Sequence, residues 1–208
     1  MEEPMAAAIG AGLPIQEPMG SMIVDIGGGT TDVAVISLGG IVTSRSIRVG
    51  GDAIDNAIIN YIKNQYNLMI GERTAEEVKM AIGSAIRLNG ESDARIRGRD
   101  LVSGLPKDLM VSPKEIREAI EDQISKIIGA IKATLDETPP DLVADLSRNG
   151  IVLAGGGALL KGMPERLIKE TGMPVRVADD PLYSVVNGAG LCVENIDLLQ
   201  QILAPENR

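Results

Sequence analysis

The chain has 208 residues, of which 44% are hydrophobic, and its formal net charge at pH 7 is −9. A chain of this length and composition can bury one sizeable core or two small subdomains, and its acidic balance argues against a nucleic-acid partner. It contains no His and a single Cys192, which excludes histidine-based catalysis and an internal disulfide, argues against a zinc site, and suits a reducing cytoplasm.

The first predicted element is a short helix over Met5–Gly12, which follows the acidic stretch Glu2-Glu3-Pro4. Acidic residues stand here where a signal peptide needs basic ones, and no apolar run is long enough to span a bilayer, so we expect a soluble protein. From the residues alone, Glu3 is an acidic side chain near a helix start, where the helix dipole favours it.

Two predicted strands flank three glycines at 27–29 within Met22–Ile36. The glycines form the bend of a hairpin in the simplest interpretation. In a second interpretation the bend binds phosphate, because glycine lets an anion approach backbone N–H groups and Thr30 and Thr31 add hydroxyl donors. Asp25 could then hold Mg²⁺ through its water shell. Neither Lys-Ser nor Lys-Thr follows the glycines, and a strand rather than a helix comes next, which excludes Walker and Rossmann loops.

Three further elements are predicted before residue 89. A strand over Ile41–Ile47 completes an antiparallel meander, and a helix over Ala53–Tyr66 follows, with Asp52 as its cap. A second helix is predicted over Thr74–Leu88, capped by Thr74 itself.

Charged residues characterise this second helix and the segment after it. Glu76 and Lys79 lie one turn apart, and the residues alone favour an exposed ion pair between them. The polar, turn-rich segment Asn89–Val111 places its three alternating arginines, at 95, 97 and 99, on one face of a strand. A solvated strand edge is the favoured interpretation of these arginines, and an anionic partner surface is the alternative.

The C-terminal half contains a second glycine bend. A long helix begins with a capping box at Ser112, and the buried strand Ile151–Ala154 runs into three glycines at 155–157. This bend is either a tight strand-to-helix junction or a ligand site, since ligands collect at the carboxyl ends of strands and at helix N-termini. A short strand over Val175–Val177 and a final helix, capped by Asp179-Asp180-Pro181, complete the chain.

Three of these segments resemble motifs of the actin, Hsp70 and sugar-kinase superfamily. Asp25–Asp32 (DIGGGTTD) is similar to its second phosphate loop, the segment 74–85 to its adenosine-side helix, and Gly155–Leu160 to its adenosine motif. A fourth motif, around Glu3, and the stretch Arg48–Asp52 look most like the MreB family of bacterial actins. The resemblance covers nearly the whole chain but only about the second half of a full family member, because no Asp-x-Gly-Thr-x-Asn loop precedes Glu3.

The resemblance implies the fold and its division. We expect an α/β fold, a ribonuclease H-like lobe of an actin-type ATPase with a mixed sheet flanked by helices. The core subdomain would comprise residues 1–52 and 113–208, and residues 53–112 would form a small inserted subdomain. The two glycine bends should then face one another across a single cleft.

The resemblance also implies the ligands, ATP and Mg²⁺, and the residues that bind them. Glu3 would orient the attacking water, and Asp25 would hold the metal ion. The expected nucleotide contacts are Gly27, Gly28, Gly29, Thr30, Glu76, Glu77, Val78, Lys79, Gly155, Gly156, Gly157 and Ala158.

The implied function is that of an ATP-binding subunit of cytoskeletal filaments that guide cell-wall synthesis and rod shape. Self-association, contacts with cell-wall synthesis and membrane morphogenesis proteins, and slow ATP hydrolysis would follow. Hydrolysis is expected to be impaired without the other lobe. The protein would be cytoplasmic, with membrane attachment supplied by the other half. The alternatives are another ATPase of the superfamily, chaperone-like or a sugar kinase, and an inert truncated fragment.

Overall fold

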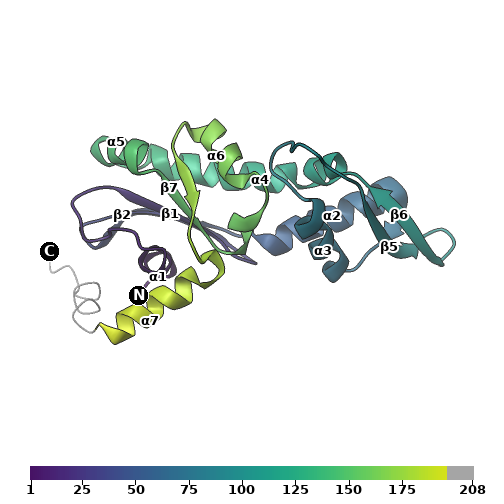
Figure 1. Cartoon of the computed structure of the whole chain (residues 1–208), viewed down its shortest axis with the longest axis horizontal. Coiled ribbons are helices and arrows are strands. Elements are labelled where there is room, and N and C mark those ends of the chain that lie inside the picture. The colour runs from purple at the N-terminus through teal and green to yellow at the C-terminus, as the bar shows by residue number, and fades with distance from the viewer. Residues whose placement is uncertain (196–208) are drawn as a thin grey trace.

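A computed structural model describes residues 1–195, which form two regions built on separate sheets (Figure 1). Within these residues the large sheet has the strand order β3-β2-β1-β7-β8 and the small sheet the order β4-β5-β6. The strands of the large sheet are β1 (Ser21–Ile26), β2 (Thr31–Ser37), β3 (Gly40–Ile47), β7 (Ile151–Ala154) and β8 (Val175–Val177). Those of the small sheet are β4 (Leu68–Met69), β5 (Ala94–Asp100) and β6 (Pro106–Val111).

Helices cover both faces of the large sheet and join it to the small one (Figure 1). The α-helices of the described residues are α1 (Glu3–Gly10), α2 (Gly51–Tyr66), α3 (Glu72–Ile82), α4 (Pro113–Asp136), α5 (Pro140–Asn149), α6 (Met163–Thr171) and α7 (Ser184–Glu194). Two short 3-10 helices follow strands of the large sheet, η1 (Gly156–Leu159) and η2 (Pro181–Tyr183).

The large sheet is mixed, as the family resemblance implies. Strands β1, β2 and β3 form an antiparallel meander, while β7 pairs in parallel with β1 and β8 pairs in parallel with β7. Since β1 and β7 run in parallel side by side, their carboxyl ends meet at the same edge of the sheet. Both glycine-rich segments begin at that edge.

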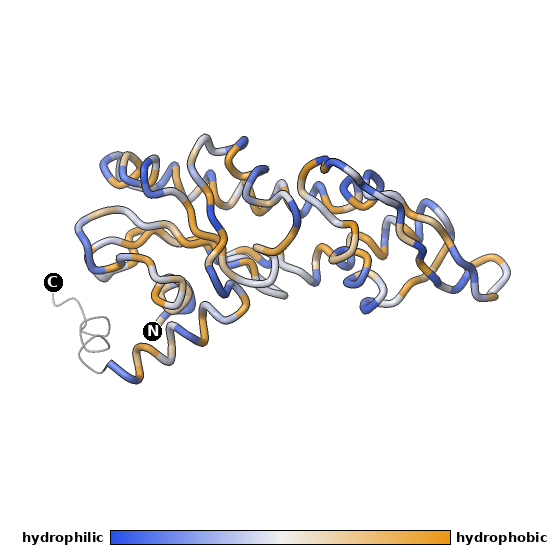
Figure 2. The backbone as a smooth tube through the Cα atoms, viewed as in Figure 1, coloured by the Kyte–Doolittle hydropathy of each residue, from blue (hydrophilic) through white to orange (hydrophobic). Residues whose placement is uncertain are grey.

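Alternate residues of β1 belong to two separate cores. Val24 packs in the core that includes Ile120 of α4, whereas Ile23 packs in the core that includes Ala7 of α1. Because both faces are covered, every residue of β1 is buried. Figure 2 shows the apolar stretches gathered along the strands of the large sheet, with hydrophilic and hydrophobic residues alternating along the covering helices.

Helices α1 and α7 cross at two glycines. A Cβ on Gly10 would lie 1.8 Å from the carbonyl oxygen of Ser184, and a Cβ on Gly188 would lie 1.9 Å from that of Ala6. These are shorter than any van der Waals contact, so only glycine fits at either position. The two helices therefore meet backbone to backbone.

The predicted helix at Ser112 is confirmed, with its capping box. The Ser112 hydroxyl accepts a hydrogen bond from the amide of Glu115, whose carboxylate accepts one in return from the amide of Ser112. The apolar stripe of α4 is buried as its spacing predicts. The helix α5 was not predicted, because Pro139-Pro140 indicated only an end, although Pro140 occupies the first position of a new helix.

Several predicted helix starts are wrong. Helix α1 begins at Glu3 rather than Met5, and α2 is preceded by Gly50 as its N-cap, so that Asp52 lies inside the helix. Helix α7 begins at Ser184, because the residues after Asp180 first form the 3-10 helix η2.

The helix predicted over Thr74–Leu88 is also shorter than expected. It begins at Glu72 after Gly71 and ends at Ile82, since Gly83 leaves the helical region with ψ near 140°. Thr74 is therefore not a cap. The strand carrying the three alternating arginines is confirmed as β5, and β6, its partner, was not predicted.

The division into residues 1–52 with 113–208, and 53–112, stays a prediction. The small sheet lies within the second of these ranges. Among the helices of residues 1–195, none has the length and apolar character needed to cross a membrane.

Candidate functional site

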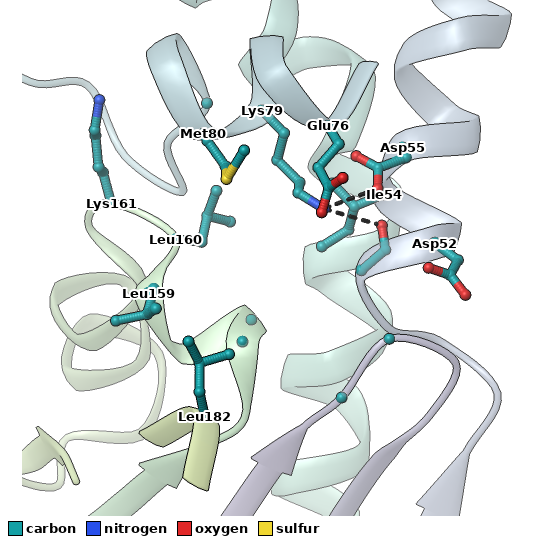
Figure 3. Close-up of a pocket in the computed structure, with 16 residues that line it drawn as sticks. Asp52, Ile54, Asp55, Glu76, Lys79, Met80, Leu159, Leu160, Lys161 and Leu182 are labelled. Atoms are coloured by element: carbon teal, nitrogen blue, oxygen red, sulfur yellow. Dashed lines mark hydrogen bonds and ion pairs between the residues drawn. The ribbon is translucent and has the colours of Figure 1, made fainter. Parts of the chain in front are cut away.

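A cavity of about 390 Å³ opens between the two glycine bends, the start of α2 and the C-terminal half of α3 (Figure 3). Its size lies within the range of small-molecule pockets, roughly 300–1,000 Å³. The lining residues are Gly27, Gly28, Gly51, Asp52, Ile54, Asp55, Glu76, Lys79, Met80, Gly83, Gly156, Gly157, Leu159, Leu160, Lys161 and Leu182. The expectation that both bends meet at one cleft is thereby confirmed.

Main-chain hydrogen bonds join the first glycine bend to the start of α2. The amide of Gly51 donates to the carbonyl of Gly27, and the amide of Asp52 donates to that of Gly28, each at 2.9 Å. A Cβ on Gly50 would lie 2.4 Å from the Gly28 carbonyl oxygen. Because the amides of Gly51 and Asp52 already donate to carbonyls of the bend, the start of α2 needs no side-chain cap. The prediction that Asp52 caps this helix is therefore wrong.

The second bend packs against the end of β1. Gly155 has φ +77°, and a Cβ there would lie 2.3 Å from the carbonyl oxygen of Ile26. A Cβ on Gly157 would lie 2.2 Å from the Ile26 side chain. The amide of Gly155 donates to Pro181 at 2.8 Å, which places η2 beside the bend. Glycine is therefore required here by close approach of backbone.

Lys79 forms the charged side of the cavity with Asp55, whereas the sequence predicts Glu76 as its partner. Its Nζ lies 2.9 Å from an oxygen of Asp55 and donates to the Gly51 carbonyl at 3.4 Å (Figure 3). The predicted Glu76–Lys79 ion pair is thus replaced by one between α3 and α2. Burial raises the pKa of Asp55, and the hydrogen bond from Lys79 opposes this shift. The other oxygen of Asp55 is buried without a hydrogen-bond partner among the described residues.

Apolar side chains form the facing side of the cavity. Leu159 and Leu160 follow the second bend, Leu182 comes from η2, and Met80 from α3 (Figure 3). The cavity therefore offers an apolar wall opposite a charged one, with glycine backbone at its base. Such a site suits a ligand with a flat apolar part and a charged part.

Asp25 lies beneath the first bend among other acidic residues. It is 6% exposed and lies opposite Asp32 in the β1–β2 register. Burial, followed by the nearby charges of Glu3 and Asp32, raises the pKa of Asp25 to about 6. Within residues 1–195 no group of three or more Asp, Glu, Cys or His side chains is arranged to hold a metal ion by itself.

The structure brings together six of the predicted contacts and leaves the others outside the cavity lining. Gly27, Gly28, Glu76, Lys79, Gly156 and Gly157 line it. Glu77 instead pairs with Arg73 on the exposed side of α3, and Val78 is buried in the core. The residues that do not line the cavity are Glu3, Asp25, Gly29, Thr30, Glu77, Val78, Gly155 and Ala158.

Sequence reasoning missed the start of α2 and the apolar wall. Gly51, Asp52 and Asp55 line the cavity, and the repeated glycines before α2 were the available signal, because a glycine-rich helix start permits close approach. Leu159, Leu160 and Leu182 carried no signal, since apolar residues near a strand end are ordinary core residues.

Two glycine bends at the ends of adjacent parallel strands of a mixed sheet, with a cavity between them, define the lobe of an actin-type fold. The family model for the MreB/Mbl protein matches residues 1–201. The chain belongs to the MreB/Mbl family, which confirms the predicted family and fold class and sets aside a chaperone or sugar kinase.

Known relatives agree with this assignment. The chain is 51% identical over 198 residues to the cell shape-determining protein MreB of Escherichia coli K12, covering 95% of this chain and 57% of that protein. It is 49% identical to Mbl of Bacillus subtilis, covering 95% and 60%. The chain thus spans little more than half the length of the curated relatives that it matches.

Solved structures show the same fold. MreB5 of Spiroplasma citri bound to ADP superposes with a TM-score of 0.91 at 44% identity, covering 94% of this chain and 60% of that one. A MamK double helical filament superposes with a TM-score of 0.77 at 25% identity, covering 93% and 59%.

Proposed function

We propose that this chain is the nucleotide-binding lobe of a cell shape-determining bacterial actin and that it holds ATP or ADP in the cavity between the glycine bends. The observation that carries the proposal is that cavity, with glycine backbone on two sides and the Lys79–Asp55 pair on a third. MreB5 of Spiroplasma citri, which this chain resembles, has been solved with ADP and with AMPPNP.

In this proposal each side of the cavity contacts one part of the nucleotide. The first bend, Gly27 to Thr30, binds the phosphates with amide and hydroxyl donors. The second bend, Gly155 to Ala158, lets the nucleoside lie against backbone, with Leu182 beside the base. Glu76 and Lys79 bracket the nucleoside from α3, whereas Glu77 and Val78 point away from the cavity.

Asp25 and Glu3 fit the two roles that hydrolysis requires. Mg²⁺ usually takes one or two protein carboxylates, several waters and substrate phosphates, so a single buried Asp25 suffices, and the unneutralised charges around it favour a cation. When bound, Mg²⁺ would neutralise charge on the phosphates. Glu3, exposed at the start of α1, orients the attacking water. Unchanged Mg²⁺-dependent ATP turnover in Glu3→Gln, relative to Glu2→Gln, would refute this role.

The structural role is foremost in the proposal. Nucleotide state controls self-association into cytoplasmic filaments that guide cell-wall synthesis, and the other half of the family fold supplies the remaining phosphate contacts and any membrane attachment. The division into residues 1–52 with 113–208, and 53–112, is part of the same proposal. The MamK relative, solved as a double helical filament, supports assembly by this fold.

The test is ADP binding by the 208-residue chain, followed with a fluorescent analogue. Gly156→Val places a side chain at the cavity, where the nearest atom to a new Cβ is a methyl of Leu182 at 3.3 Å. We expect at least about tenfold weaker binding, equivalent to about 1.4 kcal/mol. Gly190→Val on α7 is the matched control, because nothing lies within 4 Å of its Cβ. Equal affinities for the two variants would refute the site.

A further inference from the structure

One wall of the cavity consists of two chain segments joined along their backbones. Met80 and Gly83, at the end of α3, lie beside Leu160 and Lys161, which follow η1. Just beyond Gly83, Ser84 forms a parallel β-bridge with Lys161, and the amide of Ala85 donates to the Lys161 carbonyl at 2.8 Å. The position of this wall therefore depends on what holds residues 84–86.

Cavities lie on both sides of the wall formed by the end of α3 and Lys161. A second cavity of about 200 Å³ is lined by Ala81, Ile82 and Glu91, among others. Lys161 lines both cavities. Ser84 and Ala85, next to this wall, are buried at 1% and 2% exposure, so their polar groups need hydrogen-bond partners within the protein.

Arg117 of α4 forms hydrogen bonds with residues 84–86. One guanidinium nitrogen donates to the Ser84 hydroxyl at 2.7 Å, to the Ile86 carbonyl at 3.2 Å and to Glu91 at 2.7 Å. The other donates to the second oxygen of Glu91 at 3.2 Å. The arginine side chain is only 15% exposed, and its hydrogen bond lowers the pKa of Glu91.

Arg166 of α6 contacts the same segment. It donates to the Ala85 carbonyl at 3.4 Å and forms a two-point pair with Glu121 of α4, at 2.6 and 3.1 Å. Its side chain is 19% exposed. Two planar guanidinium groups, each fixed by a glutamate, therefore reach one three-residue segment from two helices of the core.

We infer that Arg117, Glu91, Arg166 and Glu121 form a clamp that positions the nucleoside side of the cavity. The clamp fixes residues 84–86, and through them the end of α3 that carries Lys79 and Met80. A shift of about 1 Å in such a wall is enough to spoil a binding geometry. Arg117 and Arg166 are positioning residues, and this inference rests on the proposed nucleotide site.

The test uses Arg117→Lys in the 208-residue chain, because lysine keeps the charge but loses the two-point geometry. We expect amide hydrogen exchange over residues 80–86 to accelerate about tenfold in the ligand-free chain, with β1 and β2 unchanged, and ADP to bind about tenfold more weakly. The exchanged pair Arg117→Glu with Glu91→Arg should restore part of both losses. Arg45→Lys is the control, because Arg45 pairs with Glu137 away from the cavity.

Three results would overturn the clamp. Unchanged exchange at residues 80–86 would show that the arginine does not hold the segment. Exchange accelerated equally in β1 and β2 would show that it acts only on global stability. Equal ADP affinity of the Arg117→Lys variant and the unaltered chain would show that the segment does not position the site. Failure of the unaltered chain itself to bind ADP would instead refute the proposed function.

Discussion

The two sides of the cavity are built in different ways. The core side, at the ends of β1 and β7, depends on Gly50, Gly155 and Gly157, each of which approaches backbone or the Ile26 side chain at a distance that excludes a Cβ. The outer side, formed by α3 and residues 84–86, is held by ion pairs and guanidinium groups. Those three glycines tolerate no side chain without a backbone shift, whereas a side built from side-chain pairs can be weakened by degrees.

The largest effect is expected on the core side, from Gly155→Ala. The new Cβ would lie 2.3 Å from the Ile26 carbonyl oxygen at a φ of +77°, so both strain and a backbone clash oppose folding. We expect the free energy of unfolding to fall by about 3 kcal/mol or more, measured by urea denaturation. In Gly129→Ala, where nothing lies within 4 Å, stability should be equal or higher. Equal stabilities would contradict the description of the core side.

The pH dependence of stability tests the same side through Asp25. Its pKa rises from 3.8 in the unfolded chain to about 6, so the folded state binds this proton more tightly. The resulting stabilisation is complete below pH 3.8 and is lost as the pH rises to about 6, a loss of up to about 3 kcal/mol. In Asp25→Asn this component should disappear, as urea denaturation at pH 4.5 and pH 7 would measure. An unaltered pH profile in the variant would count against the assignment.

A smaller effect is expected on the outer side, from Lys79→Met. The variant leaves the Asp55 carboxylate buried without its cation, which we expect to cost about 2 kcal/mol, less than a fully buried pair because both side chains keep some exposure. Adding Asp55→Asn should recover a large part of this loss. A double variant no more stable than Lys79→Met would show that the pair is not coupled.

The smallest effect is expected farthest from the cavity, at Arg97→Ala. Arg97 and Asp108 form an exposed pair across β5 and β6, and water screens it. We expect the thermal midpoint and ADP affinity to be unchanged within error, as calorimetry and a binding titration would measure. A clear loss of ADP affinity would show that the outer side of the site also depends on the small sheet.

The same contrast separates what could be predicted from the sequence from what could not. The strands around Asp25 and the glycine bends follow from local composition, and the capping box at Ser112 from local spacing. The sequence predicts a helix that continues to Leu88, because Ala85 continues the apolar stripe of α3. In the structure, Arg117 and Arg166 from other helices instead form hydrogen bonds with that segment. Similarly, the cap at Asp52 and the partner of Lys79 depend on groups that only the tertiary fold brings near.

The glycine crossing of α1 and α7 has a mechanical consequence. With Gly10 against Ser184 and Gly188 against Ala6, neither helix can rotate or slide alone without a collision of main chains. Helix α1 carries Glu3, and α7 follows directly from Leu182 on the cavity wall. The positions of Glu3 and Leu182 are therefore mechanically coupled, because a displacement of either helix must displace the other.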